Sequence, residues 1–251
     1  MRAVLETEVA VEVELLPEVR TISSSLKPID SLIGPFQSSK IAFIDSASKF
    51  LYDFTSVLCV QAIKQFDREI VFLDAGNSVD PFVLSNLAKR FGMDKKYVLK
   101  SVNVSRPFTA YQMATLIDER LEEEVKSKAA CMLVVSSFPY LFLDEDVEWP
   151  EAYKLMERCV STIQRITKEY QTISLITNYK LSNLYHRAKL RDLLYGCADK
   201  NVRFEIGRRV LKITLPEKDE SINYLPVPHN QTTLDDFTEV VFWEGQYPHI
   251  D

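Results

Sequence analysis

Hydroxyl, carboxyl and lysine side chains gather directly after the first strongly apolar run, IAFI at residues 41–44. In parallel α/β proteins, the turn between such a strand and the next helix commonly binds phosphate, because backbone N–H groups converge there. The loop GxxxxGK[ST] uses glycines to wrap the phosphates, a lysine to neutralise them and a hydroxyl to hold Mg²⁺. This segment has no glycine, and the whole chain has only 6. The sequence therefore predicts a poor phosphate site. The segment reads Asp45-Ser46-Ala47-Ser48-Lys49-Phe50-Leu51-Tyr52-Asp53.

A second group of side chains with binding chemistry lies between residues 179 and 212. Nine Lys and Arg face three acids over 180–212, although the whole chain has a formal net charge of −6. Positive side chains with interleaved tyrosines suit a single-stranded nucleic acid, which needs charge for its phosphates and rings for its bases. A solvated helix is the open alternative, since Leu184, Ala188, Arg191 and Tyr195 have helical spacing. The candidate DNA-binding residues are Lys180, Tyr185, Arg187, Lys189, Arg191, Arg208 and Arg209.

Aromatic residues next to acids form a third group. The stretch FPYLFLDEDVEWPE at 138–151 holds five carboxylates, which repel a phosphate backbone. Its aromatic residues either contact a protein partner or pack under the following helix. Alternating valines at 9, 11 and 13 predict a strand that caps the sheet or pairs with another subunit. The candidate partner-contact residues are Val9, Val11, Val13, Tyr140, Phe142, Trp149 and Trp243.

The cysteines and histidines indicate no metal site and no nucleophile. No two of the four cysteines have CxxC spacing, and buried thiols in a reducing cell are the expected reading. The three histidines have no partner at metal-ligand spacing. We therefore predict no metal and no cofactor. The chain start lacks a secretory apolar region, and no apolar run reaches membrane-spanning length, so we expect a cytoplasmic protein without a membrane partner.

Strands and helices alternate from residue 40 onward, which predicts a mostly parallel sheet flanked by helices. Asp80 and Pro81 have the residue types of a helix start. A late hairpin, turning at Gly207-Arg208, predicts an antiparallel C-terminal extension. Strands are expected at 41–44, 69–75, 99–105, 129–137 and 172–178, helices at 50–66, 80–91, 108–128 and 151–170, and the hairpin over 202–216.

Six segments in order resemble the RecA/RadA recombinase superfamily, most closely archaeal RadA-type recombinases and their paralogues, with KaiC-like proteins next. No single segment is specific to this superfamily, but the order and spacing of all six together are. The resemblance runs from about Ile29 to Val240 and implies a RecA-like α/β core. The segments are IDSLIG (29–34), the turn after IAFI, VFLDAGNSVDPFVLSNLAKRFGMD (71–94), VNVSRPFTAYQMATLID (102–118), MLVVSS (132–137) and SLITNYK (174–180).

The positions that perform catalysis in that family carry unsuitable residues here. The two loop glycines fall at Ser46 and Leu51, the phosphate-binding lysine at Tyr52 and the Mg²⁺-binding hydroxyl at Asp53. The water-activating acid falls at Gly76 and the Walker B aspartate at Ser136. Asp53 would repel a triphosphate, and Gly76 cannot orient water. Only Asn178, at the polar sensor position, keeps a usable side chain.

The resemblance therefore implies a catalytically inactive paralogue that acts as an accessory protein in homologous recombination and DNA repair. Its partners would be a RadA-type recombinase, another RecA-like paralogue or a second copy, and single-stranded DNA is a further candidate. One alternative is a regulatory KaiC-like scaffold without a DNA role. Another is an ATPase whose loop uses the shifted Lys49. The expected organisation is an N-terminal strand and linker (1–28), a degenerate ATPase core (29–240) and an acidic aromatic tail (241–251).

Overall fold

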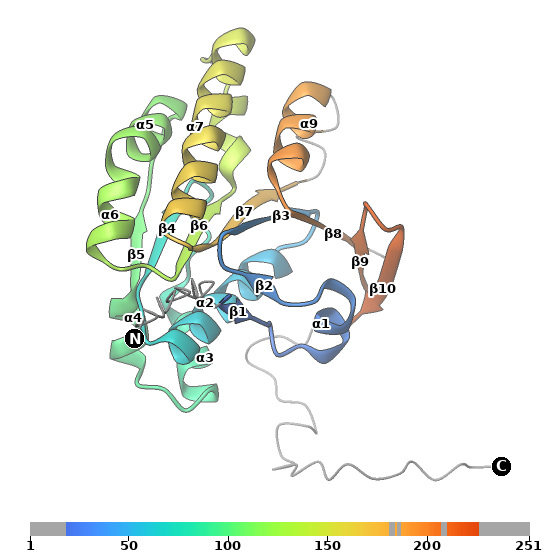
Figure 1. Ribbon diagram of the computed structural model, residues 1–251. Helices are drawn as coiled ribbons and strands as arrows, with labels where there is room; N and C mark the ends of the chain where they lie inside the picture. Colours follow the sequence, from blue (N-terminus) through green and yellow to red (C-terminus); the bar gives the residue numbers. More distant parts are fainter. Residues whose placement is uncertain (1–18, 181–183, 185–186, 207–209, 226–251) are drawn as a thin grey trace, which may run out of the picture.

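The central sheet has eight strands in the order β10-β9-β8-β3-β7-β6-β4-β5 (Figure 1). The structure is a computed structural model that describes residues 19–180, 184, 187–206 and 210–225. The six strands from β8 to β5 run parallel, and β9 and β10 add antiparallel at the β8 edge. The strands are β3 (Lys40–Ser46), β4 (Ile70–Asp74), β5 (Val102–Ser105), β6 (Met132–Ser136), β7 (Ile173–Tyr179), β8 (Lys200–Ile206), β9 (Leu211–Leu215) and β10 (Glu220–Tyr224).

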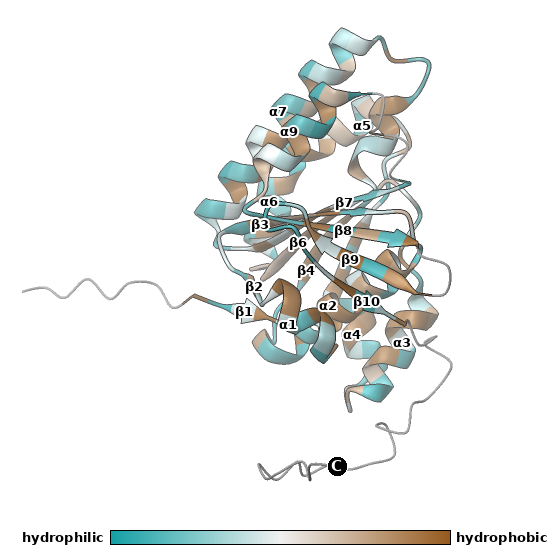
Figure 2. Ribbon diagram, turned by 90° about the vertical axis from the view of Figure 1, so that its right-hand side faces the viewer, coloured by the Kyte–Doolittle hydropathy of each residue, from teal (hydrophilic) through white to brown (hydrophobic). Residues whose placement is uncertain are grey.

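Helices cover both faces of this sheet (Figure 2). One face carries α1 (Lys27–Ile33), α2 (Phe50–Phe66), α3 (Pro81–Arg90) and α4 (Lys95–Ser101). The other carries α5 (Ala110–Thr115), a π-helical turn (Leu116–Arg120), α6 (Leu121–Ser127), α7 (Trp149–Glu169) and α9 (Ala188–Cys197). A 3₁₀ helix spans Phe138–Leu143, and β1 (Thr21–Ile22) pairs with β2 (Phe36–Gln37) in a separate antiparallel ribbon. None of the described helices combines the length and apolarity needed to span a bilayer.

Apolar side chains fill a separate core on each face, as continuous hydrophobic strands require. Phe54 on α2 packs in the first core against Phe36 and Phe204, with centroids 6.2 and 5.4 Å away. Phe43 packs in the second core edge-on to Tyr195, 5.2 Å away. Side chains at alternate positions of each strand thus belong to opposite faces. This alternation decides which polar side chains can meet at the ends of the strands.

The predicted α/β class, the mostly parallel sheet and the antiparallel extension are confirmed. Helix 50–66 has the predicted bounds, and the Asp80 carboxylate caps α3 by accepting from the Phe82 N–H at 2.8 Å. β8 and β9 pair antiparallel, although the predicted turn at Gly207-Arg208 lies outside the described residues.

Two predictions about the elements are wrong in detail. The strand expected at 99–105 begins only at Val102, because Asp94 caps a short helix, α4, that runs through Ser101. The helix expected at 108–128 begins at Ala110 behind the Thr109 cap and widens into a π-helical turn. Strand β10 was not expected, because its alternating exposed residues bury little apolar surface.

Candidate functional site at the carboxyl edge of the sheet

The turn from β3 into α2 contains only Ala47, Ser48 and Lys49. Five amides in and after this turn donate within the protein. Their acceptors are the Phe204 carbonyl for Ala47 (2.8 Å), the Ser46 hydroxyl for Ser48 (3.0 Å), the Ser48 hydroxyl for Phe50 (3.2 Å), the Ser48 carbonyl for Leu51 (3.2 Å) and the Lys49 carbonyl for Tyr52 (2.9 Å). A phosphate-binding loop needs such N–H groups free to face its ligand.

The residues aligned with the phosphate-binding loop have other roles in the structure. Ser46 is the buried last residue of β3, and Leu51 is fully buried in the first turn of α2. The Tyr52 ring lies 5.4 Å from the Tyr179 ring, and burial raises the pKa of its phenol. Asp53 is half-buried in the same helical turn, and Lys49 is exposed at the helix start. Of this group, Lys49 alone presents a positive charge to solvent.

Gly76 lies where the backbone after β4 closely approaches Ser137. A Cβ atom at position 76 would be 2.3 Å from the Ser137 hydroxyl oxygen and 2.7 Å from its Cβ. Ser137 itself has φ of 52°, in the left-handed region, and its hydroxyl is buried. A side chain at position 76 therefore requires this backbone to move, so the site has no room for an acid there.

A closed polar network occupies the ends of β4, β6 and β7. The buried Asp74 carboxylate accepts from the Ser78 amide and hydroxyl at 2.8 Å, and Arg106 lies 3.3 Å from it. The Ser78 hydroxyl is also 2.8 Å from the Ser136 hydroxyl, which is 3.4 Å from that of Thr177. Ser136 thus joins neighbouring strands through neutral hydroxyls and presents no carboxylate at this edge.

A second network lies on the other face, between β3, β7, β8 and α9. Asp45 is buried and accepts from the Asn178 amide at 2.8 Å and the Tyr195 hydroxyl at 3.0 Å. The Arg203 guanidinium donates to the same tyrosine hydroxyl at 2.8 Å. Burial raises the pKa of Asp45 and raises that of Tyr195 to about 12. The sensor-position Asn178 therefore serves to hold a carboxylate of its own chain.

Comparison with known proteins decides the family. A family model described as Rad51 matches residues 51–192, more than half of the 251 residues. The chain belongs to the Rad51 family. This agrees with the RecA-like architecture of its core and with the superfamily that its sequence resembles.

Two curated relatives of this Rad51-family chain are the meiotic recombination protein DMC1/LIM15 homolog of Mus musculus and that of Homo sapiens. Each is 28% identical over 116 residues, which is 44% of this chain and 34% of the relative. The match thus spans about a third of each relative's length. The family model and these partial matches together relate the chain to recombination proteins.

The basic segment of this Rad51-family chain is divided by the fold. Lys180 directly follows β7, and Lys189 and Arg191 are exposed on α9. Arg187 instead stacks on Trp149, 5.0 Å from the ring centroid. Lys200 lies at the opposite edge of the sheet, and Arg203 is held by Tyr195. The described members of the basic segment therefore do not form one continuous surface.

The tyrosines expected to alternate with these charges for base stacking are turned inward where they are described. Tyr179 packs on Tyr52, and Tyr195 binds Asp45. Tyr185, Arg208 and Arg209 lie outside the described residues, as do Val9, Val11, Val13 and Trp243. Of the basic candidates, Lys180, Lys189 and Arg191 are exposed in the described part of the chain.

The predicted aromatic contact surface needs one correction and one addition. Phe142 is 0% exposed, because it packs edge-on to Phe138 beneath α7, so it is not available to a partner. Trp149 is half-buried, whereas Tyr140 is 56% exposed. Phe82 and Phe108, which the sequence analysis did not single out, are 80% and 78% exposed and follow the ends of β4 and β5. Tyr140, Phe82 and Phe108 therefore present aromatic surface on the carboxyl-edge side.

Gly76→Ala is expected to lower the free energy of unfolding by about 1–3 kcal/mol, because the new Cβ collides with Ser137. Adding Ser137→Gly removes the collision and suits the positive φ, so it should recover most of the loss. Urea denaturation of both variants checks this. An unchanged denaturation midpoint for Gly76→Ala would show that the backbone at position 76 is not in close contact with Ser137.

The raised pKa of Asp45 makes its effect on stability depend on pH. Above the ordinary aspartate pKa of about 3.9, the unfolded chain ionises this group more readily than the folded chain. Stability relative to Asp45→Asn should therefore fall as pH rises from about 4 through the raised folded-state pKa. Urea unfolding at several pH values measures it, with Asp192→Asn on exposed α9 as the control. If the stability relative to Asp45→Asn instead rises over this pH range, the folded-state pKa of Asp45 is not raised.

Proposed function

We propose that this chain is a non-hydrolysing member of the Rad51 family that acts in recombination as an accessory binding protein. The observation that carries the proposal is the three-residue turn after β3, in which the Ser46 and Ser48 side chains and neighbouring carbonyls accept from five amides. Opening that turn for a triphosphate would break these bonds together. Tyr52 and Gly76 add to this, since the first offers no cation and the second no general base.

Binding through protein partners is the mode of action that these features favour. The exposed rings of Phe82, Phe108 and Tyr140 provide the large apolar side chains that interfaces prefer. The acids at 144–151, next to Tyr140, disfavour nucleic acid at that position. A recombinase of the same superfamily, another paralogue or a second copy of this chain is the partner we propose, within homologous recombination and DNA repair.

Two alternatives have a specific observation in their favour. Exposed Lys49 at the start of α2 favours an ATPase with an unorthodox loop, since a cation at a helix N-terminus suits phosphate. The inward tyrosines and divided basic segment favour a regulatory scaffold of KaiC-like type without a DNA role. The two measurements below separate both alternatives from the main proposal.

Calorimetry of ATP and ADP with Mg²⁺ is expected to give no saturable heat, and neither nucleotide should raise the melting temperature. The reason is that five amides in and after the turn already donate within the protein and that no lysine stands at position 52. Lys49→Ala is the matched variant. Micromolar binding that Lys49→Ala abolishes would establish the unorthodox nucleotide site and sink the proposal of inactivity.

Single-stranded oligonucleotide binding tests the DNA role. If α9 contacts the backbone, Lys189→Ala with Arg191→Ala should weaken binding and reduce the salt slope by about 1 per lost phosphate contact. Fluorescence anisotropy over a series of salt concentrations measures both quantities. Lys64→Ala, on α2 at the other face of the sheet, is the control. Equal binding by all variants would remove α9 from the DNA role and favour the scaffold alternative.

A further inference from the structure

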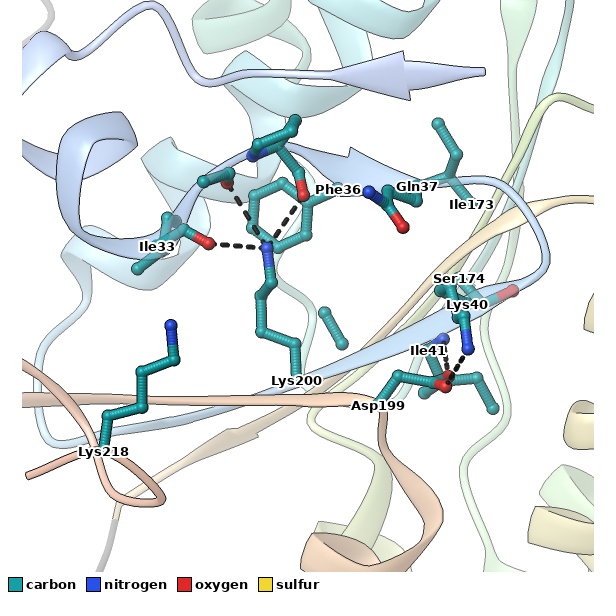
Figure 3. A pocket seen from close by; sticks show the side chains of 13 residues that line it. Ile33, Phe36, Gln37, Lys40, Ile41, Ile173, Ser174, Asp199, Lys200 and Lys218 are labelled. Carbon is teal, nitrogen blue, oxygen red and sulfur yellow. Dashed lines mark hydrogen bonds and ion pairs between the residues drawn. The ribbon is translucent and has the colours of Figure 1, made fainter. Parts of the chain in front are cut away.

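A cavity of about 410 Å³ lies at the amino ends of β3 and β7, at the edge opposite to the residues aligned with the ATPase site (Figure 3). Buried Ile33, Phe36, Ile41 and Ala42 contribute apolar surface to its lining. Exposed polar side chains at its rim are Gln37, Lys40 and Lys218. The cavity therefore combines an apolar interior with a polar opening, the usual composition of a small-molecule site.

The Asp199 carboxylate in the cavity lining already has partners within the protein. Asp199 accepts from the Lys40 ammonium at 2.7 Å and from the Ile41 amide at 2.9 Å. Lys40 and Asp199 consequently neutralise one another at one end of the cavity (Figure 3). Two further lysines, Lys200 and Lys218, remain in the lining.

Among the described residues, the groups that hold Lys200 in place are all neutral. Its ammonium donates to the carbonyls of Ile33 at 2.6 Å and Pro35 at 2.8 Å, and it lies 5.1 Å from the Phe36 ring centroid. These contacts satisfy its donors at the end of α1, which explains its position as a structural cap. They do not cancel its full charge. Burial, together with the positive charge of Lys218, lowers the pKa of Lys200.

No comparable contacts among the described residues explain the position of the Lys218 side chain. It stands in the turn between β9 and β10 and is exposed, and its side chain extends alongside that of Lys200 (Figure 3). Within the described ranges, neither lysine forms an ion pair with a carboxylate. Two like charges near one cavity repel each other, and an anion between them would relieve that repulsion.

We propose that this cavity is a binding site for a small phosphate monoester or inorganic phosphate, in which Lys218 contacts the phosphate and Lys200 adds its fixed charge from the cavity wall. A phosphate monoester places close to two negative charges on one compact group at neutral pH, matching the two lysines that form no ion pair with a described carboxylate. A dicarboxylate would spread the same charge over a longer molecule. The volume also leaves room for a short organic body against Phe36 and Ile41.

The test is calorimetric titration of the full chain with inorganic phosphate and with glycerol 3-phosphate, at constant ionic strength set by chloride. Saturable binding of at least one of them is expected. Lys218→Gln should weaken it about tenfold, the loss expected for one charged hydrogen bond. Lys212→Gln is the matched control, because Lys212 alternates with buried Leu211 and Ile213 and therefore faces the other side of the sheet. Its affinity should equal that of the parent chain.

The two ligands distinguish the source of the phosphate. Tighter binding of glycerol 3-phosphate assigns a monoester whose organic part uses the apolar wall, whereas equal affinities assign inorganic phosphate. Lys200 provides a second readout that needs no variant. Its pKa, followed through the ¹³Cε shift in an NMR pH titration, should rise when phosphate binds. The absence of saturable heat for both ligands, or equal affinity for the parent chain and Lys218→Gln, would overturn the proposal.

Discussion

The internal hydrogen bonds of the β3–α2 turn are the constraint on which the carboxyl edge of this molecule depends. Ala47 bonds to β8 through the Phe204 carbonyl, and the Ser46 carbonyl accepts from Lys180 after β7. The turn is therefore tied to both neighbours of the central strand. With the chain anchored in this way, α2 begins at once, and its first turn brings Leu51 into the core and Tyr52 against Tyr179. A loop wide enough to enclose phosphates would require all of these contacts to form elsewhere.

The polar residues at the same edge have become structural groups that join strands. Asp74, Ser78 and Ser136 connect β4 with β6, while Asp45, Asn178 and Tyr195 connect β3 and β7 with α9. Buried polar groups must find partners, because an unpaired donor or acceptor costs roughly 1–3 kcal/mol. The Asp45 and Asp74 carboxylates find those partners in the chain itself.

The two edges of the sheet therefore differ in character. At the carboxyl edge, charges are buried in closed networks and exposed aromatic rings face solvent. At the amino edge, a cavity retains two lysines without acidic partners among the described residues. The sequence count placed Lys200 in one basic segment with Lys189 and Arg191, but these two residues lie near the start of α9, whereas Lys200 follows the end of α9 and begins β8 at the amino edge. Proximity along a chain is a poor guide to a shared surface when most of a helix lies between the residues.

The sequence by itself determined the alternation of elements, because hydrophobic periodicity and helix caps such as Asp80 are local signals. Its ordered segments also resemble the superfamily to which the Rad51 family belongs. From that resemblance, the sequence also predicts the positions where the phosphate-binding residues are replaced. Tertiary structure alone decided that Phe142 is buried, that Tyr195 meets Asp45 across 150 positions, and that Lys200 and Lys218 line one cavity. The physical reason is that burial, hydrogen-bond partners and uncompensated charge depend on which segments pack together. Strand order, which no local pattern encodes, sets that packing.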